Sequence, residues 1–259
     1  MSSRQLLMRK SLDFDDLRGT LMVVVILAAW EATAKISASP FFPTLETVMR
    51  GAWALVESGD LWLDVRATLV RVVLGFVVGG LIGFVVGTLL AVSTIAARGF
   101  QASMTLLRHI PTFGLVPLLS LWFGTQDLTK IILIGIAAYF PVLLQTQAGI
   151  LTVPQSYLDV AAALTFNRRQ VLLRVLFPYA MPSILTGIRH AVAYSWISGV
   201  GVELFINSGT GGLGGLLAAA RIAMRMDYIV IGMAIVAVIG YAMTRGIAVL
   251  ERRIISWAP

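Results

Sequence analysis

Long apolar runs, with very little charge between them, restrict this chain more than any other feature of its sequence. Of its 259 residues, 58% are hydrophobic and only 13% are charged, and the mean hydropathy is +0.88. A soluble domain carries about 25% charged residues. Because the shortage of charge extends along the whole chain, the sequence predicts an all-α, polytopic membrane protein.

About six apolar runs are expected to cross the membrane. They cover residues 20–35, 69–94, 104–123, 131–151, 182–204 and 228–250. Residues 1–19 form a polar N-terminal tail, and residues 20–259 form a single transmembrane domain. The small-x-small pattern Ala32-Thr33-Ala34 allows a second interpretation of the first run, as a cleaved signal peptide. The long tail and the neighbouring Glu31 favour an uncleaved span.

Two features of the first third concern the membrane surface and helix packing. Residues 44–57 are expected to form a short helix along the outer interface, with Trp53 and Trp62 as membrane-belt residues. Gly79, Gly83 and Gly87 recur every four residues, and small residues at this spacing let helices approach closely in lipid. The glycines indicate either a seam between two copies or packing within one chain.

Composition argues against several kinds of site. The chain has no cysteine, so it forms no disulfide or thiolate metal site. Its two histidines, His109 and His190, are too few for a histidine metal cluster, and no metal site is expected. The phosphate-binding pattern G-x-x-x-x-G-K-[ST] is absent. The net charge of +7 is interpreted as the positive-inside signature of a membrane protein, not as nucleic-acid binding.

The glycine-rich stretch NSGTGGLGGLL, residues 207–217, is a weak signal for a phosphate site. It follows no predicted strand, so nucleotide binding is rejected. A loop or re-entrant segment is expected here instead.

A partly polar stretch from residue 157 to residue 188 predicts two short helices joined by a turn. The first covers residues 155–164, and the turn covers residues 165–167. Asn167 is a good N-cap for the second helix, residues 168–176. Pro178 is expected to end that helix, because proline disfavours the helical conformation of the preceding residue. Such a hairpin suits docking of a partner; the simpler alternative is an interfacial hairpin whose arginines face lipid head groups.

The same stretch resembles the "EAA…G…I-LP" loop of ABC importer permeases. Residues at the matching spacing are Asp159, Ala161, Val175, Phe177 and Pro178. In that family the loop forms coupling helices that dock into a cleft of the ATPase subunit. Asp159 replaces the family's glutamate, Val160 its first alanine and Thr165 its turn glycine. The resemblance implies a cytoplasmic coupling loop over about residues 153–178, with the docking residues Asp159, Ala161, Thr165, Asn167, Arg168, Arg169, Phe177 and Pro178.

The segment LRHIPTFGLVPLLSLWFG, residues 107–124, resembles one branch of that family, the permeases for nitrate, taurine and aliphatic sulfonates. The similarity extends from about residue 43 to residue 241, and the branch implies a small anionic solute. Pro111 and Pro117 break this third run twice. Broken backbone at membrane depth is tolerated where it lines a cavity or is buried in protein.

The resemblance also implies the partners of this chain. Two ATPase subunits would bind the coupling loops, a second identical copy would complete the path, and a periplasmic or lipid-anchored protein would deliver the solute. ATP would be bound by the partner, so this chain is expected to carry no cofactor and to be no enzyme. Closure of the ATPase pair would move the loops and swing the spans from inward-facing to outward-facing in a bacterial inner membrane.

The distribution of basic residues predicts that both termini lie in the cytoplasm. Eleven basic residues fall on that side: Arg4, Arg9, Lys10, Arg18, Arg98, Arg168, Arg169, Arg174, Arg245, Arg252 and Arg253. Six fall on the outer side: Lys35, Arg50, Arg66, Lys130, Arg221 and Arg225. The excess inside follows the positive-inside rule.

Ionisable residues in the spans are candidates for the translocation path: Arg108, His109, Arg189, His190 and Glu203. Each costs at least roughly 2.5 kcal/mol at membrane depth on insertion scales. Arg108 and Arg189 could attract an anion, or could snorkel to the interface. The two histidines could instead be satisfied core or interface residues. Glu203 could pair with Arg221 or Arg225, or cap the glycine-rich loop.

Two other functional classes stay open at this point. An ion-gradient-driven secondary transporter would show an internal repeat with buried carboxylates, and the sequence has no convincing repeat. A membrane scaffold without transport is the third hypothesis, and the broken third run argues mildly against it.

Overall fold

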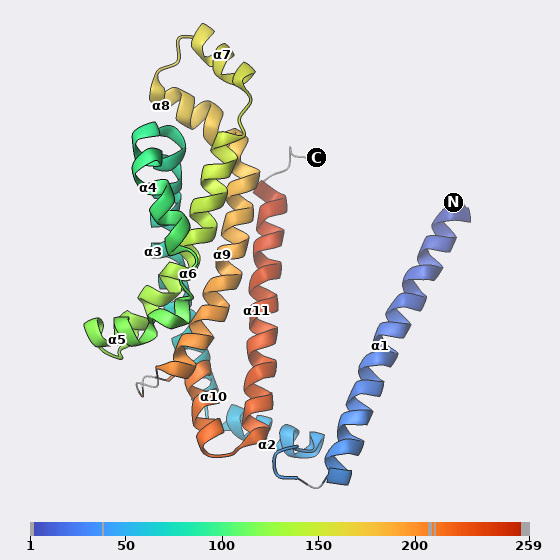
Figure 1. Cartoon of the computed structure of the whole chain (residues 1–259). Helices are drawn as coiled ribbons and strands as arrows, with labels where there is room; N and C mark the ends of the chain where they lie inside the picture. Colours follow the sequence, from blue (N-terminus) through green and yellow to red (C-terminus); the bar gives the residue numbers. More distant parts are fainter. Residues whose placement is uncertain (1–2, 38, 207–208, 210, 255–259) are drawn as a thin grey trace.

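The computed structural model describes residues 3–37, 39–206, 209 and 211–254, and this part of the chain is helices and loops without a strand (Figure 1). The first half comprises α1 (Ser3–Ser37), α2 (Leu45–Glu57), α3 (Asp60–Val92), α4 (Thr94–Leu107), the 3₁₀ turn η1 (Thr112–Leu115) and α5 (Val116–Phe123). The second half comprises α6 (Asp127–Leu151), α7 (Gln155–Ala163), α8 (Arg168–Val171), the π turn η2 (Leu172–Leu176), α9 (Phe177–Phe205), α10 (Leu213–Ile222) and α11 (Met226–Ile254). The predicted all-α fold is confirmed.

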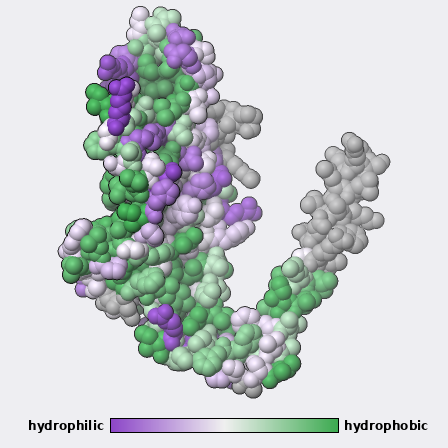
Figure 2. Space-filling model, in the orientation of Figure 1, coloured by the Kyte–Doolittle hydropathy of each residue, from purple (hydrophilic) through white to green (hydrophobic). Residues whose placement is uncertain are grey.

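Five described helices are long and apolar enough to cross a membrane, and α4 with η1–α5 makes a sixth if that broken pair counts as one span. The pair bends by 91° at the break, which lies before Pro111 as predicted. The second break predicted at Pro117 is absent, because Pro117 lies in the first turn of α5. Figure 1 shows α7 and α8 together at one end of the bundle and α10 and α2 at the other. Apolar surface covers α5 and the lower part of α1, while hydrophilic patches gather toward the α7–α8 end (Figure 2).

Helices α3, α6 and α9 form the centre of the bundle, and glycines allow α3 to lie directly against α6. A side-chain carbon added at Gly79 would overlap the carbonyl of Gly135, and one at Gly83 would lie 2.5 Å from the Tyr139 oxygen. Gly87 meets the Leu143 carbonyl in the same way. The glycine stripe is therefore an intramolecular seam, which decides between the two interpretations of its spacing.

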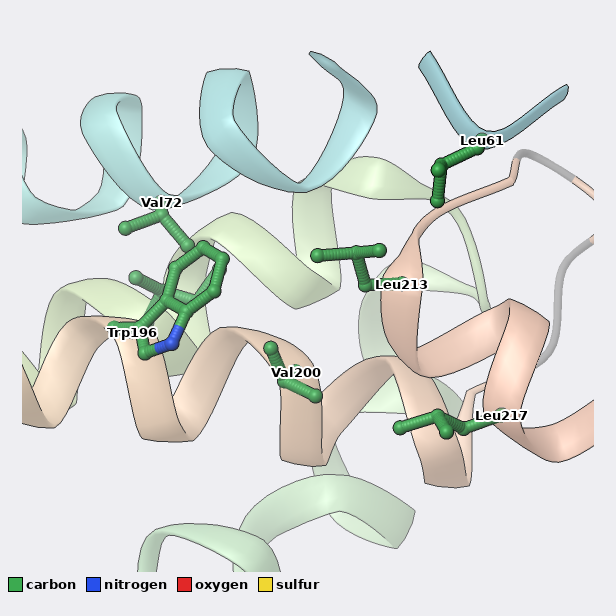
Figure 3. Packing of buried hydrophobic residues seen from close by; sticks show 7 residues of the cluster. Leu61, Val72, Trp196, Val200, Leu213 and Leu217 are labelled. Atoms are coloured by element: carbon green, nitrogen blue, oxygen red, sulfur yellow. The ribbon is translucent and has the colours of Figure 1, made fainter. Parts of the chain in front are cut away.

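A second packing centre lies toward the α10 end, where α3, α9 and α10 meet (Figure 3). Val72, Trp196 and Leu213 point toward one another there and are buried. The indole N–H of Trp196 donates to the Val236 carbonyl at 3.1 Å, which ties α11 to the same centre. This packing holds the glycine-rich stretch against the long helices.

Helix α1 contacts the rest of the described chain mainly near its C-terminal end. The Trp30 indole donates to the Pro43 carbonyl at 2.9 Å and stacks on Phe42 at 5.0 Å. The predicted short helix is confirmed as α2, whose N-cap Thr44 accepts from the Thr47 amide.

One sequence prediction about helix ends is wrong. Pro178 does not end a helix; it lies in the first turn of α9, and helical structure continues from Arg168 to Phe205. The π turn η2 precedes it, with the Phe177 amide donating to the Leu172 carbonyl. Pro178 has no N–H to donate to a carbonyl of the preceding turn, so the helix passes it with one hydrogen bond fewer. The change of hydrogen-bonding register lets the chain pass the ring.

Candidate functional site

A cleft of about 640 Å³ lies between the break after α4 and the middle of α6 and α9. Its polar members include Arg108, His109, Gln145 and His190. Its walls are largely apolar and include Ile110, Pro111, Phe113, Ile136, Ala137, Phe140, Leu144 and Ile197. The cleft opens on the surface of this single chain, since Arg108, His109 and His190 are all exposed.

The broken third span places Arg108 at the cleft. Helix α4 ends at Leu107, with Arg108 as its C-cap, and Pro111 has no N–H with which to continue the ladder. The chain then turns through 91° into η1 and α5. Among the described residues, none forms a hydrogen bond or ion pair with the Arg108 guanidinium. An exposed guanidinium beside the cleft is thus left available to another group.

The structure separates the five predicted path residues. Arg108, His109 and His190 line the cleft. The side chain of Arg189 points in a different direction from that of His190, because successive side chains on a helix are rotated by about 100°. Arg189 instead forms an ion pair with Glu251 of α11. Glu203 lies away from the cleft, in a cluster of buried charges at the α10 end.

This buried ion cluster consists of Thr68 and Arg71 of α3, Asp127 and Lys130 of α6, and Glu203 of α9. The Arg71 Nη1 lies 2.7 Å from Glu203 Oε1, and its Nε lies 2.9 Å from Asp127 Oδ1. The Thr68 hydroxyl donates to Glu203 Oε2 at 2.8 Å. Arg71, Lys130 and Glu203 are at most 3% exposed. The charges satisfy one another, so the cluster is a structural joint between three helices.

The cluster also holds the glycine-rich stretch. The Gly214 amide donates to Glu203 Oε2 at 3.0 Å, and the Gly211 carbonyl accepts from Arg71 at 2.9 Å. The Gly212 amide donates to Asp64 at 2.6 Å. Gly212 has φ +122°, and a side-chain carbon there would lie 2.6 Å from the Glu203 carboxyl carbon. Glu203 therefore caps the start of α10, the second of the roles that the sequence left open, while Arg225 pairs with Asp227.

Sequence reasoning missed Arg71 and its partners as a group. The apolar pattern starts the second run at residue 69 and puts Arg71 at the end of a span, whereas α3 begins at Asp60. On that longer helix Asp64, Thr68 and Arg71 are spaced by four and three residues and share a face. An arginine two residues inside an apolar run was the available signal.

The predicted hairpin at the other end is present as α7 and α8. Asn167 caps α8 with a capping box: its side chain accepts from the Gln170 amide at 2.9 Å, and the Gln170 side chain accepts from the Asn167 amide at 2.8 Å. Thr165 forms the turn with φ +54°. The left-handed conformation that glycine would adopt easily is thus taken by a threonine, and both the turn and the cap are confirmed.

The other coupling-loop residues lie at different depths. Asp159, Arg168, Arg169 and Pro178 are exposed, and Phe177 is half-buried with its ring 5.3 Å from that of Phe84. Ala161 is only 2% exposed. Three apolar side chains remain largely exposed on the loop: Tyr157, Val160 and Leu164.

Comparison with known proteins identifies the family. Residues 67–256 match the family described as "Binding-protein-dependent transport system inner membrane component". The chain belongs to this family. It is 31% identical over 243 residues to the Bacillus subtilis protein named as the aliphatic sulfonates transport permease SsuC, covering 93% of this chain and 87% of that one. It is 30% identical to the taurine transport system permease TauC of Escherichia coli, covering 92% and 88%.

The fold agrees with solved transporters. The crystal structure of an amino acid ABC transporter with histidines superposes with a TM-score of 0.64 at 20% identity, covering 78% of this chain and 97% of that one. The predicted family and branch are confirmed. This chain is the permease subunit of an ABC importer, a multi-pass inner membrane protein that works with an ATPase subunit and a solute-binding protein. ATP is hydrolysed on the separate subunit, so the secondary-transporter and scaffold hypotheses are rejected.

Proposed function

We propose that this permease subunit imports a small anionic solute through the cleft beside α6 and α9. The observation that carries the proposal is Arg108, a guanidinium at a broken span, with no acidic partner among the described residues. An unpaired charge at membrane depth is costly, so it marks a substrate path by default. The names of the relatives SsuC and TauC, for sulfonates and taurine, support an anionic or anion-bearing solute.

The surroundings of Arg108 favour an anion over a cation. His109 and His190 line the same cleft and can donate hydrogen bonds. No aspartate or glutamate is among the residues that line it. A planar guanidinium is also suited to bidentate binding of an oxyanion.

At one end of the bundle, α7 and α8 supply the coupling surface for the ATPase (Figure 1). Tyr157, Val160 and Leu164 are more than half exposed, with Arg168 and Arg169 beside them. An apolar patch with basic neighbours suits a protein cleft better than bulk water. Two ATPase subunits, one per permease copy, would bind the ATP and drive the transition, and this chain would bind no cofactor.

The membrane orientation follows from charge. The described ends of α1 and α11 point toward the end that carries α7 and α8 (Figure 1). The excess of Lys and Arg assigned to that side supports a cytoplasmic location for both termini. The α10 end would then face the periplasmic or lipid-anchored binding protein. Two identical permease copies, with their open clefts turned toward one path, would complete the translocation unit.

The path is tested by replacing Arg108 with glutamine. We expect Arg108→Gln to lower uptake of a radiolabelled alkanesulfonate by about tenfold, as expected for loss of one charge-assisted hydrogen bond. Basal ATP hydrolysis and assembly should stay unchanged. Arg221→Gln, which removes an exposed charge outside the cleft, is the matched control. Full uptake by Arg108→Gln would exclude the proposed path.

The coupling surface is tested by co-purification. Asp159→Arg should abolish capture of the ATPase subunit by the tagged permease, because it replaces an exposed carboxylate with a fourth basic side chain on the α7–α8 surface, beside Arg168, Arg169 and Arg174. Glu57→Arg, an equally exposed carboxylate at the α10 end, should leave capture intact. Undiminished capture by Asp159→Arg would show that the ATPase docks elsewhere.

A further inference from the structure

A second, smaller hollow lies between α9 and α11, and we propose that it binds a phospholipid with an anionic head group. One acyl chain would lie in this hollow, the α9–α11 crevice, and the head group would bind Arg245. The crevice has a volume of about 290 Å³, and its lining includes Val192, Ala193 and Trp196 of α9 and Val236, Ala237 and Gly240 of α11. The lipid would be a bound component of the permease and not its solute, so the inference goes beyond the proposed function.

Contacts between α9 and α11 close the crevice at both ends and leave its middle open. Toward the α10 end, the Trp196 indole donates to the Val236 carbonyl at 3.1 Å. Toward the α7–α8 end, Arg189 forms its ion pair with Glu251. No residue of α11 from 237 to 250 is buried. The two helices are therefore joined at two points, with unfilled apolar surface between them.

The polar groups that line the crevice already take part in hydrogen bonds. The Thr244 hydroxyl donates to the Gly240 carbonyl at 2.9 Å, and the Tyr241 hydroxyl accepts from Arg245 Nε at 3.1 Å. The Trp196 N–H is used in its bond to Val236. Apolar hollows that offer water no polar partners stay dry. Because this one lies between two membrane spans, hydrocarbon suits it better than water or a polar solute.

The length and the open rim of the crevice suit an acyl chain of one leaflet. The helix rises about 12 Å from Val236 to Thr244, at 1.5 Å per residue. The hydrocarbon of one leaflet is about 15 Å thick, which is half of a core of about 30 Å. At the rim Ile197 is 61% and Tyr241 65% exposed. A chain can therefore enter sideways from the surrounding bilayer.

Arg245 supplies a positive charge at the α7–α8 end of the crevice. Its bond to Tyr241 holds the guanidinium beside a lining residue and uses one of its five N–H donors. Among the described residues no carboxylate pairs with it, and Glu251 is already paired with Arg189. Basic pockets between transmembrane helices bind anionic lipid head groups. A zwitterionic head group would bring a cation beside the same guanidinium, which weakens the attraction.

The test uses the permease–ATPase complex in lipid nanodiscs and two probes, phosphatidylglycerol and phosphatidylcholine, which carry the same photoactivatable acyl chain. Labelled peptides are identified by mass spectrometry after illumination. We expect the anionic probe to label α9 and α11 at the crevice at least about fivefold more than the zwitterionic probe. This ratio corresponds to one basic residue near a membrane surface.

Two variants with matched controls locate the chain and the head group. Ala237→Phe fills the crevice and should abolish labelling there, whereas Ala242→Phe, at an exposed alanine of α11 outside the crevice, should not. Arg245→Gln should remove the preference for phosphatidylglycerol, whereas Arg253→Gln, which removes an exposed charge farther along α11, should keep it. Basal ATP hydrolysis reports whether each complex is assembled, and if Ala237→Phe fails to assemble, Arg245→Gln and its control decide.

Several outcomes would overturn the lipid site. Equal labelling by the two probes, no labelling at the crevice, or full labelling of Ala237→Phe would each do so. Equal loss of preference in Arg245→Gln and Arg253→Gln would mean that only the general surface charge attracts the lipid. The other possible occupant is a second copy of this chain. A photocrosslinking amino acid placed at Ala237 would then give a covalent permease dimer, and that result also overturns the lipid site.

Discussion

The two sides of α6 show what different packing makes of one apolar helix. On the side facing α3, Ile134 and Ala138 have no exposed surface, and Lys130 is 1% exposed. On the other side, Phe140 and Leu144 are only partly buried and line the cleft. Both sides are made of similar residues, so the difference comes from the neighbours and not from the hydropathy of α6.

The charges beside the two sides differ in the same way. On the closed side Arg71 pairs with Glu203 and with the half-exposed Asp127, which offsets the cost of burying the Arg71 and Glu203 charges. On the open side Arg108 is unpaired within the described chain. Paired charges join helices, whereas an unpaired charge is free for a ligand. Substitutions on the closed side should therefore lower stability, and substitution of Arg108 should lower transport.

The largest effect is expected in the buried ion cluster. Glu203→Ala leaves the Arg71 guanidinium with one carboxylate fewer and the Gly214 amide without its acceptor. Removal of one partner from a buried pair costs about 3–5 kcal/mol. The thermal unfolding midpoint of the purified permease–ATPase complex should fall clearly. The midpoint of the Glu203→Gln complex should fall less, because glutamine keeps an acceptor for the Gly214 amide. Identical midpoints for all three proteins would show that the cluster does not hold α10.

A smaller contrast is expected between two leucines of α6. Leu133 has no exposed surface and packs against Leu119, Val202 and Ile206, so Leu133→Ala opens a cavity and should cost about 2–3 kcal/mol, near the lower end of the range for buried leucines. Leu144→Ala on the cleft side should cost well under half as much, since that side chain is only partly buried. Unfolding midpoints of the two variants measure the contrast, and equal losses would mean that the cleft is filled by protein in the complex.

The smallest effect is expected at the glycine seam between α3 and α6. Gly79 lies in the seam, and the adjacent Gly80 lies outside it and serves as the matched control. Gly79→Ala forces α3 away from the Gly135 carbonyl and should cost about 1–3 kcal/mol. Gly80→Ala meets only Val142 Cγ2 at 3.9 Å, so it should be neutral or stabilise the helix by up to about 1 kcal/mol. Cross-linking between cysteines introduced in pairs, one in α3 and one in α6, would report the distance between the two helices directly. Equal stability of the Gly79→Ala and Gly80→Ala variants would contradict close packing of α3 against α6 at the glycine stripe.

Much of the fold was predictable because its signals are local. Apolar runs locate the spans, Asn167 locates the start of α8, and Pro111 locates the break in the third span. The end predicted at Pro178 was wrong because the outcome depends on the hydrogen-bonding register of the preceding turn, which a π turn shifted. Hydropathy also missed the first two turns of α3, because they carry Asp60, Asp64 and Arg66.

The candidate site was only partly predictable for the same reason. The sequence placed Arg108 and Arg189 in equivalent positions near span ends, yet one lines the cleft and the other pairs with Glu251. By itself, the sequence determined the membrane class, the family, the broken span and the coupling loop, because composition and short motifs specify them. The tertiary structure alone decided which charges are paired, because a charge at membrane depth finds its partner on another helix, and the chain order does not state which helices meet.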